Sequence, residues 1–201
     1  MRKKTRVNSD KAYPWILTIG ASIGLLAAFV LTLEKIALLK DPAHRLSCSL
    51  NPVLSCGSII GSPEASAFGF PNTLMGLASF AVVITIGVGI LAGASYKRWF
   101  WRGLQSGAVL GILFVHWLAF ESLYEIGALC IYCMVVWSIT WPIFWYTTLY
   151  NLRHGHIPTP TRLKPVVAFA QRHHADILVA WYVLIFALIL ENFWYYWSTI
   201  I

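Results

Sequence analysis

The stretch GALCIYCMVVW, residues 127–137, places two cysteines at the start of a segment that is apolar enough to cross a membrane. Cys130 and Cys133 are separated by two residues, which on a helix brings their sulfur atoms about one turn apart. The free amides and the dipole at a helix N-terminus favour a thiolate, and the thiolate is the nucleophile in disulfide exchange. The stretch therefore predicts a redox-active pair at the boundary between water and lipid.

The composition of the whole chain is that of an integral membrane protein. Of the 201 residues, 58% are hydrophobic and only 11% are charged, and the mean hydropathy is +0.67. A soluble globular chain carries about 25% charged residues, so this chain has too few to cover a water-facing surface. The net charge of +7 lies mostly in loops, as in membrane proteins, and we find no nucleic-acid-binding motif. The expected surroundings are the lipid bilayer, with no nucleic acid partner.

Apolar runs predict five membrane-spanning helices in an all-α protein with a single membrane domain, residues 1–201. The spans cover approximately residues 15–37, 72–95, 101–121, 127–150 and 176–198. No small-residue cleavage site follows the first run, so we interpret it as a retained span rather than a signal peptide. Twelve of the fifteen Lys and Arg residues precede the first span or follow the second and the fourth. The positive-inside rule then puts the N-terminus in the cytoplasm and the C-terminus outside, which favours a bacterial plasma membrane.

This orientation brings all four cysteines to the outer side, where disulfides form and persist. Cys48 and Cys56 lie in the longest outer loop, whereas Cys130 and Cys133 open the fourth span. Two stabilising disulfides are one interpretation. A zinc site is another, although the seven residues between Cys48 and Cys56 exceed the usual spacing of a zinc pair. A relay accounts better for the different depths, because loop thiols meet soluble thiols and the membrane pair meets a lipid-soluble quinone that takes two electrons.

With these pieces in place, the sequence resembles the vitamin K epoxide reductase family. The resemblance rests on Cys48 and Cys56, on FGFPNTLMG at residues 68–76 and on CIYC at residues 130–133, and it covers most of residues 14–150. It implies a four-helix bundle around a quinone, with the outer loop packed over it as a lid. Residues 57–68 of that loop are expected to form a short interfacial helix. A fifth transmembrane helix is typical of the bacterial and plant relatives.

Many of those relatives carry a fused thioredoxin-like domain after the fifth span, and this sequence has none there. The resemblance therefore implies a separate partner outside the membrane, a thioredoxin-like or DsbA-like oxidoreductase. The chain is then a quinone-dependent thiol oxidase that generates disulfides in this partner and passes the electrons to the membrane quinone pool. Two alternatives stay open: a reductase of vitamin K quinone or epoxide, and a membrane protein without enzymatic activity whose disulfides are structural.

The resemblance also implies a role for each matching residue. Cys48 is expected to exchange with the partner, and Cys56 is expected to attack Cys130. Cys133 is expected to face the quinone. Asn72 matches the family asparagine that donates a hydrogen bond to a quinone carbonyl, and its alternative role is the N-cap of the second span.

Three further positions complete the predictions. Trp137 stands where vertebrate members have a tyrosine that bonds the quinone. Its indole also donates a hydrogen bond but is larger, which favours menaquinone or ubiquinone over vitamin K epoxide. No metal is expected. His116 in the third span is assigned as a packed polar contact, with proton relay and haem ligation as alternatives. Glu34 and Lys35 are assigned as ion-paired or snorkelling groups at the interface.

Overall fold

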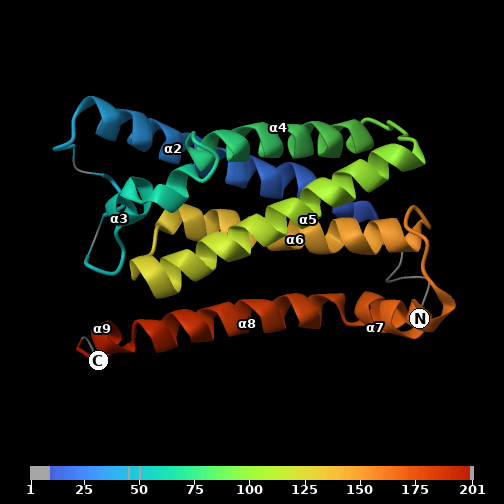
Figure 1. The fold of residues 1–201 in the computed structure, drawn as a ribbon. Coiled ribbons are helices and arrows are strands. Elements are labelled where there is room, and N and C mark those ends of the chain that lie inside the picture. The colour runs from blue at the N-terminus through green and yellow to red at the C-terminus, as the bar shows by residue number, and fades with distance from the viewer. Residues whose placement is uncertain (1–9, 45, 50, 200–201) are drawn as a thin grey trace.

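The computed structural model describes residues 10–44, 46–49 and 51–199, and its regular structure is almost entirely helical (Figure 1). The long helices are α2 (Ala21–Lys40), α4 (Asn72–Leu91), α5 (Arg98–Phe120), α6 (Ile131–Arg153) and α8 (His174–Asn192). The short helices are α3 (Cys56–Gly61), α7 (Lys164–Arg172) and α9 (Trp194–Trp197). Turns of π-helix (Ile16–Gly20, Glu121–Ile126) and of 3₁₀ helix (Pro63–Ser66, Thr161–Leu163) extend or link them. The predicted all-α class is confirmed.

Helices α2, α4, α5 and α6 form a four-helix bundle, and α8 lies along its side (Figure 1). Helix α5 packs along α6, while α2 packs against both α4 and α6. Helix α3 and the first turns of α4 and α6 lie at one end of the bundle, which we name the sulfur end because it carries the cysteines. The α4–α5 turn, α7 and the last turn of α6 lie at the opposite end.

Within the described residues, four helical segments are long and apolar enough to cross a membrane, namely Asp10–Lys40, Asn72–Leu91, Arg98–Ile126 and His174–Asn192. They correspond to the first, second, third and fifth predicted spans and fit a multi-pass membrane protein. Helix α6 is as long as α5, at 23 residues, but it is not among these four segments, and it carries several Trp, Tyr and Thr side chains. It packs among α2, α5 and α8, and no residue along its fully described length is exposed. The interior helix therefore does not need the apolar surface that lipid requires.

Glycines let α4 approach the first span closely. A Cβ atom at Gly24 would lie 2.6 Å from the ring of Phe80. A Cβ atom at Gly87 would overlap Thr18 Oγ1 and lie 2.9 Å from the Thr18 backbone nitrogen. Lipid tails are as apolar as leucine, so helices in a membrane associate through close van der Waals packing rather than through the hydrophobic effect. These two glycines supply such packing between α4 and the first span.

Helix α8 is attached to the bundle by hydrogen bonds and by aromatic packing, with Trp181 stacked on Trp141 at 5.0 Å between ring centroids. None of its 19 residues, all of them described, is fully buried. Trp181 Nε1 donates to His116 Nε2 at 2.9 Å, which links α8 to α5. Near the other end of α8, Asn192 Nδ2 donates to the carbonyl of Leu123. The helix is therefore fixed at several points along its length without burying a side chain of its own.

A proline in α6 provides another attachment point for α8. Pro142 has no backbone N–H, so the carbonyl of Ser138, four residues earlier, lacks its usual partner within the helix. The Tyr182 hydroxyl donates to this carbonyl at 2.6 Å. Helix α8 thus satisfies an acceptor that α6 cannot satisfy by itself.

The outer loop forms its short helix in two pieces rather than one. The predicted helix of residues 57–68 appears as α3, Cys56–Gly61, followed by the 3₁₀ turn Pro63–Ser66. Pro63 interrupts the α-helix because it lacks the N–H that would continue the hydrogen-bond ladder. Lys35 Nζ donates to the carbonyl of Ile60 at 2.7 Å, so α2 holds the end of α3.

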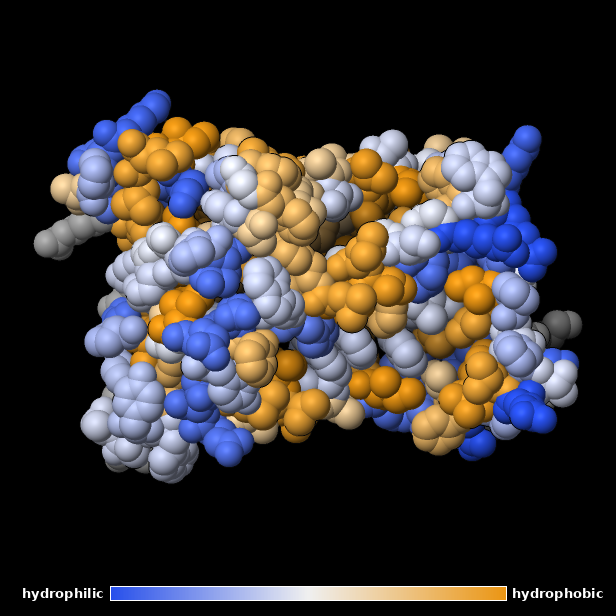
Figure 2. All heavy atoms as spheres, viewed as in Figure 1, coloured by the Kyte–Doolittle hydropathy of each residue, from blue (hydrophilic) through white to orange (hydrophobic). Residues whose placement is uncertain are grey.

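The end opposite the sulfurs is tied by polar contacts and carries much of the basic charge. Arg153 Nη1 lies 2.6 Å from Asp10 Oδ1, and this ion pair joins the end of α6 to the first span. The buried Asn151 donates to the carbonyl of Trp101 at 3.2 Å. Figure 2 shows hydrophilic side chains gathered toward both ends of the molecule and hydrophobic ones along the middle. This distribution suits a protein that crosses a bilayer.

Candidate active site

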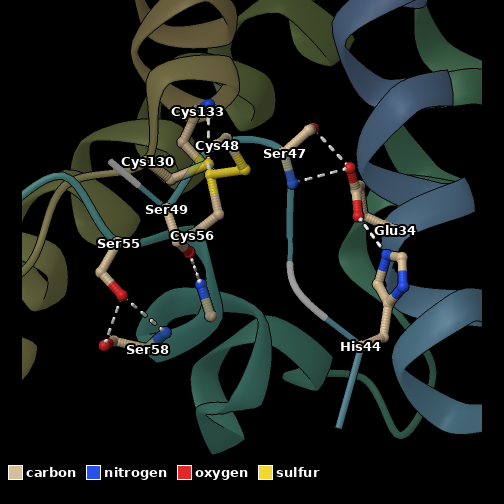
Figure 3. The surroundings of a disulfide bond; sticks show 11 residues. Glu34, His44, Ser47, Cys48, Ser49, Ser55, Cys56, Ser58, Cys130 and Cys133 are labelled. Atoms are coloured by element: carbon tan, nitrogen blue, oxygen red, sulfur yellow. Dashed lines mark hydrogen bonds and ion pairs between the residues drawn. A yellow bond between two sulfur atoms is a disulfide. The ribbon is translucent and has the colours of Figure 1, made fainter. Parts of the chain in front are cut away.

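Three sulfur atoms meet inside the sulfur end (Figure 3). Cys48 and Cys56 are joined by a disulfide, and Cys130 and Cys133 are free thiols. The Sγ of Cys56 lies 3.2 Å from the Sγ of Cys130. The Sγ atoms of Cys48, Cys56 and Cys130 all lie within 4.8 Å of one another. The structure therefore brings the loop pair into contact with the first cysteine of the membrane pair.

A short piece of parallel β-structure places Cys56 beside Cys130. Leu54 and Leu129 form an isolated parallel bridge. The N–H of Leu129 donates to the carbonyl of Val53 at 2.7 Å, and the N–H of Ser55 donates to the carbonyl of Leu129 at 2.9 Å. Backbone bonds thus fix both segments next to the reactive sulfurs. This bridge joins segments that are far apart in the chain, so no local sequence pattern predicts it.

Local turns prepare the two segments for this bridge. In an Asx-type turn, Asn51 Oδ1 accepts hydrogen bonds from the backbone N–H groups of Val53 at 3.0 Å and of Leu54 at 2.7 Å. Ser55 is the N-cap of α3, so Cys56 becomes the first residue of that helix. Gly127 has a φ of +67°, the left-handed conformation that favours glycine, and it ends the π-helical turn before Cys130.

Helix α6 begins at Ile131, so the fourth predicted span starts later than residue 127. Cys130 is its N-cap, and the Cys130 sulfur accepts the backbone N–H of Cys133 at 3.4 Å. The amides and the dipole at this helix end stabilise negative charge on that sulfur. Cys133 lies within the first turn and packs against both the buried cysteine cluster and the core around Trp137. The membrane pair thus connects the loop to the interior of the bundle.

The sulfurs are shielded from water. Cys48 is 2% exposed, and Cys56 and Cys130 are fully buried. Three cysteine sulfurs at this spacing also suit a metal ion, the zinc alternative of the sequence analysis. However, Cys48 and Cys56 are bonded to each other, and metals are bound by thiolates. A disulfide in contact with a thiol is the arrangement that thiol–disulfide exchange requires.

Asn72 is the first residue of α4, but its side chain does not cap that helix. Its Oδ1 accepts the N–H of Ala67 at 3.2 Å, and its Nδ2 donates to the carbonyl of Glu64 at 2.6 Å. The N-cap position belongs to Pro71, so the alternative role of Asn72 as the N-cap is wrong. An amide nitrogen carries two hydrogens, which leaves Asn72 one donor. The neighbouring Thr73 hydroxyl is buried and has no partner within the described ranges.

Trp137 lies one turn after Cys133 and is buried in the core. Trp141 follows one turn later, and residues four apart share a face of a helix, so the three side chains form a stripe along α6. The Nε1 of Trp141 is buried and has no hydrogen-bond partner in the part of the chain that the structure describes. An unpaired buried donor is costly in apolar surroundings, so this nitrogen is available to a polar atom of a ligand.

His116 is a packed contact between α5 and α8. Its Nε2 accepts from Trp181, and because an indole nitrogen only donates, this nitrogen of His116 carries no proton. Its Nδ1 therefore holds the hydrogen and donates to the carbonyl of Ile112 at 2.8 Å. Both ring nitrogens are engaged, which favours the packed-contact assignment over proton relay or haem ligation.

The contacts that hold the segment before Cys48 are not predicted by any pattern in the sequence. One carboxylate oxygen of Glu34 accepts the hydroxyl of Ser47 at 2.5 Å, and the other lies 3.1 Å from His44 Nε2 (Figure 3). Glu34 and Lys35, assigned above to the interface, thus both fasten the outer loop to α2. A carboxylate at the apolar end of a predicted span is the signal that points to such a partner.

Comparison with known families agrees with this geometry. The profile of the Vitamin K epoxide reductase family matches residues 15–148, which is more than half of the chain. The match includes the four cysteines, Asn72 and Trp137, and it ends within α6, before α7 and α8. No individual curated protein gives a significant match to the chain.

Proposed function

The chain belongs to the vitamin K epoxide reductase family, and we propose that it is a thiol oxidase that passes electrons from an external dithiol partner to a membrane quinone. The family match by itself establishes a membrane oxidoreductase that links a quinone to disulfide chemistry. The proposal adds the direction of electron flow, the partner and the order of the cysteines. One observation carries it: the loop disulfide contacts a free thiol, with the Sγ atoms of Cys56 and Cys130 3.2 Å apart.

The relay begins at the loop pair. A thiolate of the partner attacks the Sγ of Cys48, forms a mixed disulfide with it and releases Cys56 as a thiolate. A second thiolate of the partner then displaces Cys48. The partner leaves with a disulfide, and the loop pair is left as two thiols. Two electrons have moved from the partner to this protein.

The second transfer takes place within the protein. The Cys56 thiolate attacks Cys130 of the oxidised membrane pair, forms a Cys56–Cys130 disulfide and releases Cys133 as a thiolate. Cys48 then attacks Cys56, which restores the loop disulfide and releases Cys130. The redox state of Figure 3, with the loop pair joined and the membrane pair free, corresponds to the end of this transfer. The burial of Cys56 and Cys130 supports a direct transfer between them, since foreign thiols are excluded.

We propose that the quinone binds beside Cys133, and that Asn72 and the stripe residues Trp137 and Trp141 are its candidate hydrogen-bond donors. Asn72 has one amide hydrogen left after its bond to the loop, and Trp141 has an unpaired buried nitrogen, so the chain offers donors for carbonyl oxygens. When bound, a quinone supplies an acceptor for two electrons and two protons. Cys133 provides the thiolate next to this stripe and bonds again to Cys130 as the electrons leave. The bulk of Trp137 favours menaquinone or ubiquinone over vitamin K epoxide.

The charges indicate the orientation in the membrane. Arg98, Arg102 and Arg153 lie at the end opposite the sulfurs, so the positive-inside rule puts that end in the cytoplasm. The sulfur end then faces the oxidising side of a bacterial plasma membrane, where disulfides are made. A thioredoxin-like or DsbA-like oxidoreductase on that side is the dithiol partner we propose.

Anaerobic quinone reduction by the purified protein tests this proposal. The donor is a reduced DsbA-like protein, the acceptors are menaquinone and ubiquinone, and Cys133→Ala is assayed in parallel. We expect quinol to form as the donor becomes oxidised, and to be absent with the variant. Absence of quinol with every quinone, while the cysteines of the protein remain unchanged, would refute the oxidase. Activity confined to vitamin K epoxide would favour the reductase alternative.

A further inference from the structure

Cys48 is inaccessible to a protein partner in the arrangement of Figure 3. Its side chain is 2% exposed and lies in a buried cluster with Leu31, Leu46 and Ile60. The attacking thiolate of a partner must reach the Cys48 sulfur itself, so the segment that carries Cys48 has to move away from the bundle before exchange begins. Whatever holds this segment in place therefore controls how often exchange occurs.

One carboxylate holds the segment on α2. Glu34 Oε1 accepts the hydroxyl of Ser47 at 2.5 Å and its N–H at 3.3 Å, and Glu34 Oε2 lies 3.1 Å from His44 Nε2. The Glu34 side chain is only 12% exposed, and hydrogen bonds to a shielded carboxylate are stronger than those between neutral groups. Ser47 immediately precedes Cys48, so these bonds act next to the reactive sulfur. We name Glu34, His44 and Ser47 the Glu34 latch.

We propose that Glu34 is a positioning residue for thiol exchange, because the Glu34 latch sets the fraction of molecules in which Cys48 is open to a partner. This inference rests on the proposed function, in which Cys48 is the cysteine that meets the partner. Glu34 touches none of the reacting sulfurs and acts through Ser47. Its bonds also return Cys48 to Cys56 after the partner has reduced the loop pair.

The latch acts in opposite directions on the two transfers. Exchange with the partner needs an open segment, so its rate rises with the open fraction. The transfer to the membrane pair is completed when Cys48 attacks Cys56, which the Leu54–Leu129 bridge holds beside Cys130. This step needs the closed segment, so its rate falls as the open fraction rises. A weaker latch should therefore accelerate the first transfer and slow the second. A general loss of stability would slow both.

The first test follows the two transfers separately in full-length protein in lipid nanodiscs. Reduced thioredoxin is the protein donor, and stopped-flow fluorescence records its oxidation. For Glu34→Ala we expect loop reduction about tenfold faster, as loss of hydrogen bonds to a carboxylate implies, and a slower appearance of thiols at Cys130 and Cys133. Glu34→Gln should lie between, because its amide still accepts one bond from Ser47. If both transfers proceed at the same rates in Glu34→Ala as in the wild type, the proposed role of the Glu34 latch is refuted.

A second test does not depend on the proposed function. The protein is reduced with a phosphine, and alkylation of Cys48 and Cys133 by N-ethylmaleimide is followed by peptide mass spectrometry. We expect Cys48 to react about tenfold faster in Glu34→Ala, and Cys133 to react at the wild-type rate. Unchanged Cys48 reactivity would overturn the latch even if quinone is reduced. If the wild type reduces no quinone but Cys48 is alkylated faster in Glu34→Ala, the proposed oxidase activity is refuted and the role of Glu34 in holding the segment stands.

Matched variants separate the latch from general effects of mutation. Glu125→Gln removes an exposed carboxylate at the same end of the molecule and should behave as the wild type. Ser47→Ala removes the hydroxyl that donates to Glu34, and this variant replaces Glu34→Ala in both tests if Glu34→Ala does not fold. The double variant Glu34→Ala/Ser47→Ala should open no further than Glu34→Ala, because both changes remove the same contact. Additive effects would contradict the latch.

Discussion

The four-helix bundle and helix α8 are both apolar, yet different interactions hold them in the molecule. In the bundle, Gly24 and Gly87 let α4 pack directly on the first span. Helix α8 has no fully buried residue along its described length, and side chains such as Trp181 and Tyr182 hydrogen-bond it to the bundle. The bundle is thus a close-packed unit, whereas α8 lies on its surface and is held there by hydrogen bonds and by the stacking of Trp181 on Trp141.

The reactive residues follow this division. Cys130 and Cys133 lie at the start of a bundle helix, and the loop disulfide contacts Cys130 through Cys56 at the sulfur end. Directly after α8, Phe193 is fully buried in the core cluster that contains Trp137. Changes in the bundle should therefore alter chemistry or folding strongly, and changes in α8 should mainly alter how that helix is held.

Removal of the terminal thiol should have the largest effect. In Cys133→Ala the membrane pair cannot form a disulfide, so we expect quinone reduction to be abolished while the loop disulfide still exchanges with a reduced partner. Quinol formation measures the loss of quinone reduction, and partner oxidation in the same anaerobic sample measures the exchange that the loop disulfide retains. Cys133→Ser keeps the size of the side chain and should be equally inactive. Residual quinone reduction in either variant would show that a residue other than Cys133 transfers the electrons to the quinone.

The second largest effect should come from a methyl group added between α4 and the first span. In Gly87→Ala the new Cβ would overlap Thr18 and press on its backbone, so we expect the free energy of unfolding to fall by about 1–3 kcal/mol. Gly111→Ala is the matched control, because its Cβ would meet Thr140 at an ordinary 3.9 Å. Reversible unfolding in mixed micelles measures both. Equal stability of the two variants would contradict the close packing of α4 on the first span.

Loss of the Asn72 amide should affect the quinone step within the intact bundle. For Asn72→Asp the acceptor for Ala67 remains, but the donors are lost, so we expect kcat/KM for the quinone to fall about tenfold. Steady-state kinetics with varied quinone concentration check this. Reduction of the loop disulfide by the partner should be unchanged. An equal loss in both half-reactions would instead indicate that Asn72 only supports the loop.

The smallest effect should come from α8. Tyr182→Phe removes the donor to the Ser138 carbonyl, and hydrogen bonds between membrane helices average about 0.6 kcal/mol. We expect faster amide exchange in α8 and quinone reduction within about twofold of the wild type. Tyr195→Phe, at an exposed tyrosine after α8, is the control and should change neither quantity. A large loss of activity in Tyr182→Phe would make α8 part of the site.

The helices could be predicted from the sequence because a bilayer demands long apolar runs, and most of these runs became helices near their expected bounds. Helix α6 shows where this rule weakens. Enclosed by other helices, it tolerates Trp, Tyr and Thr side chains, and its start is set by Gly127 and the N-cap Cys130 rather than by apolarity.

The contacts of the site were less predictable than its residues. Depth and spacing singled out the four cysteines, but the contact between Cys56 and Cys130 depends on the bridge between Leu54 and Leu129, which no local pattern announces. Asn72 had the residue type of an N-cap, yet the 3₁₀ turn before it offered backbone partners instead. Glu34 was visible as a charge near lipid, and its partners depend on how the loop folds.

The closeness of three sulfurs has a consequence for how the protein is made. Cys48 and Cys56 leave the ribosome before α4, α5 and α6 exist, so they can pair before their neighbour Cys130 has been synthesised. When Cys130 arrives, an incorrect bond from it to Cys56 is the same bond that we propose as an intermediate of the relay. The exchange that serves the partner would then also correct the enzyme's own cysteines during biogenesis, without help from a separate isomerase.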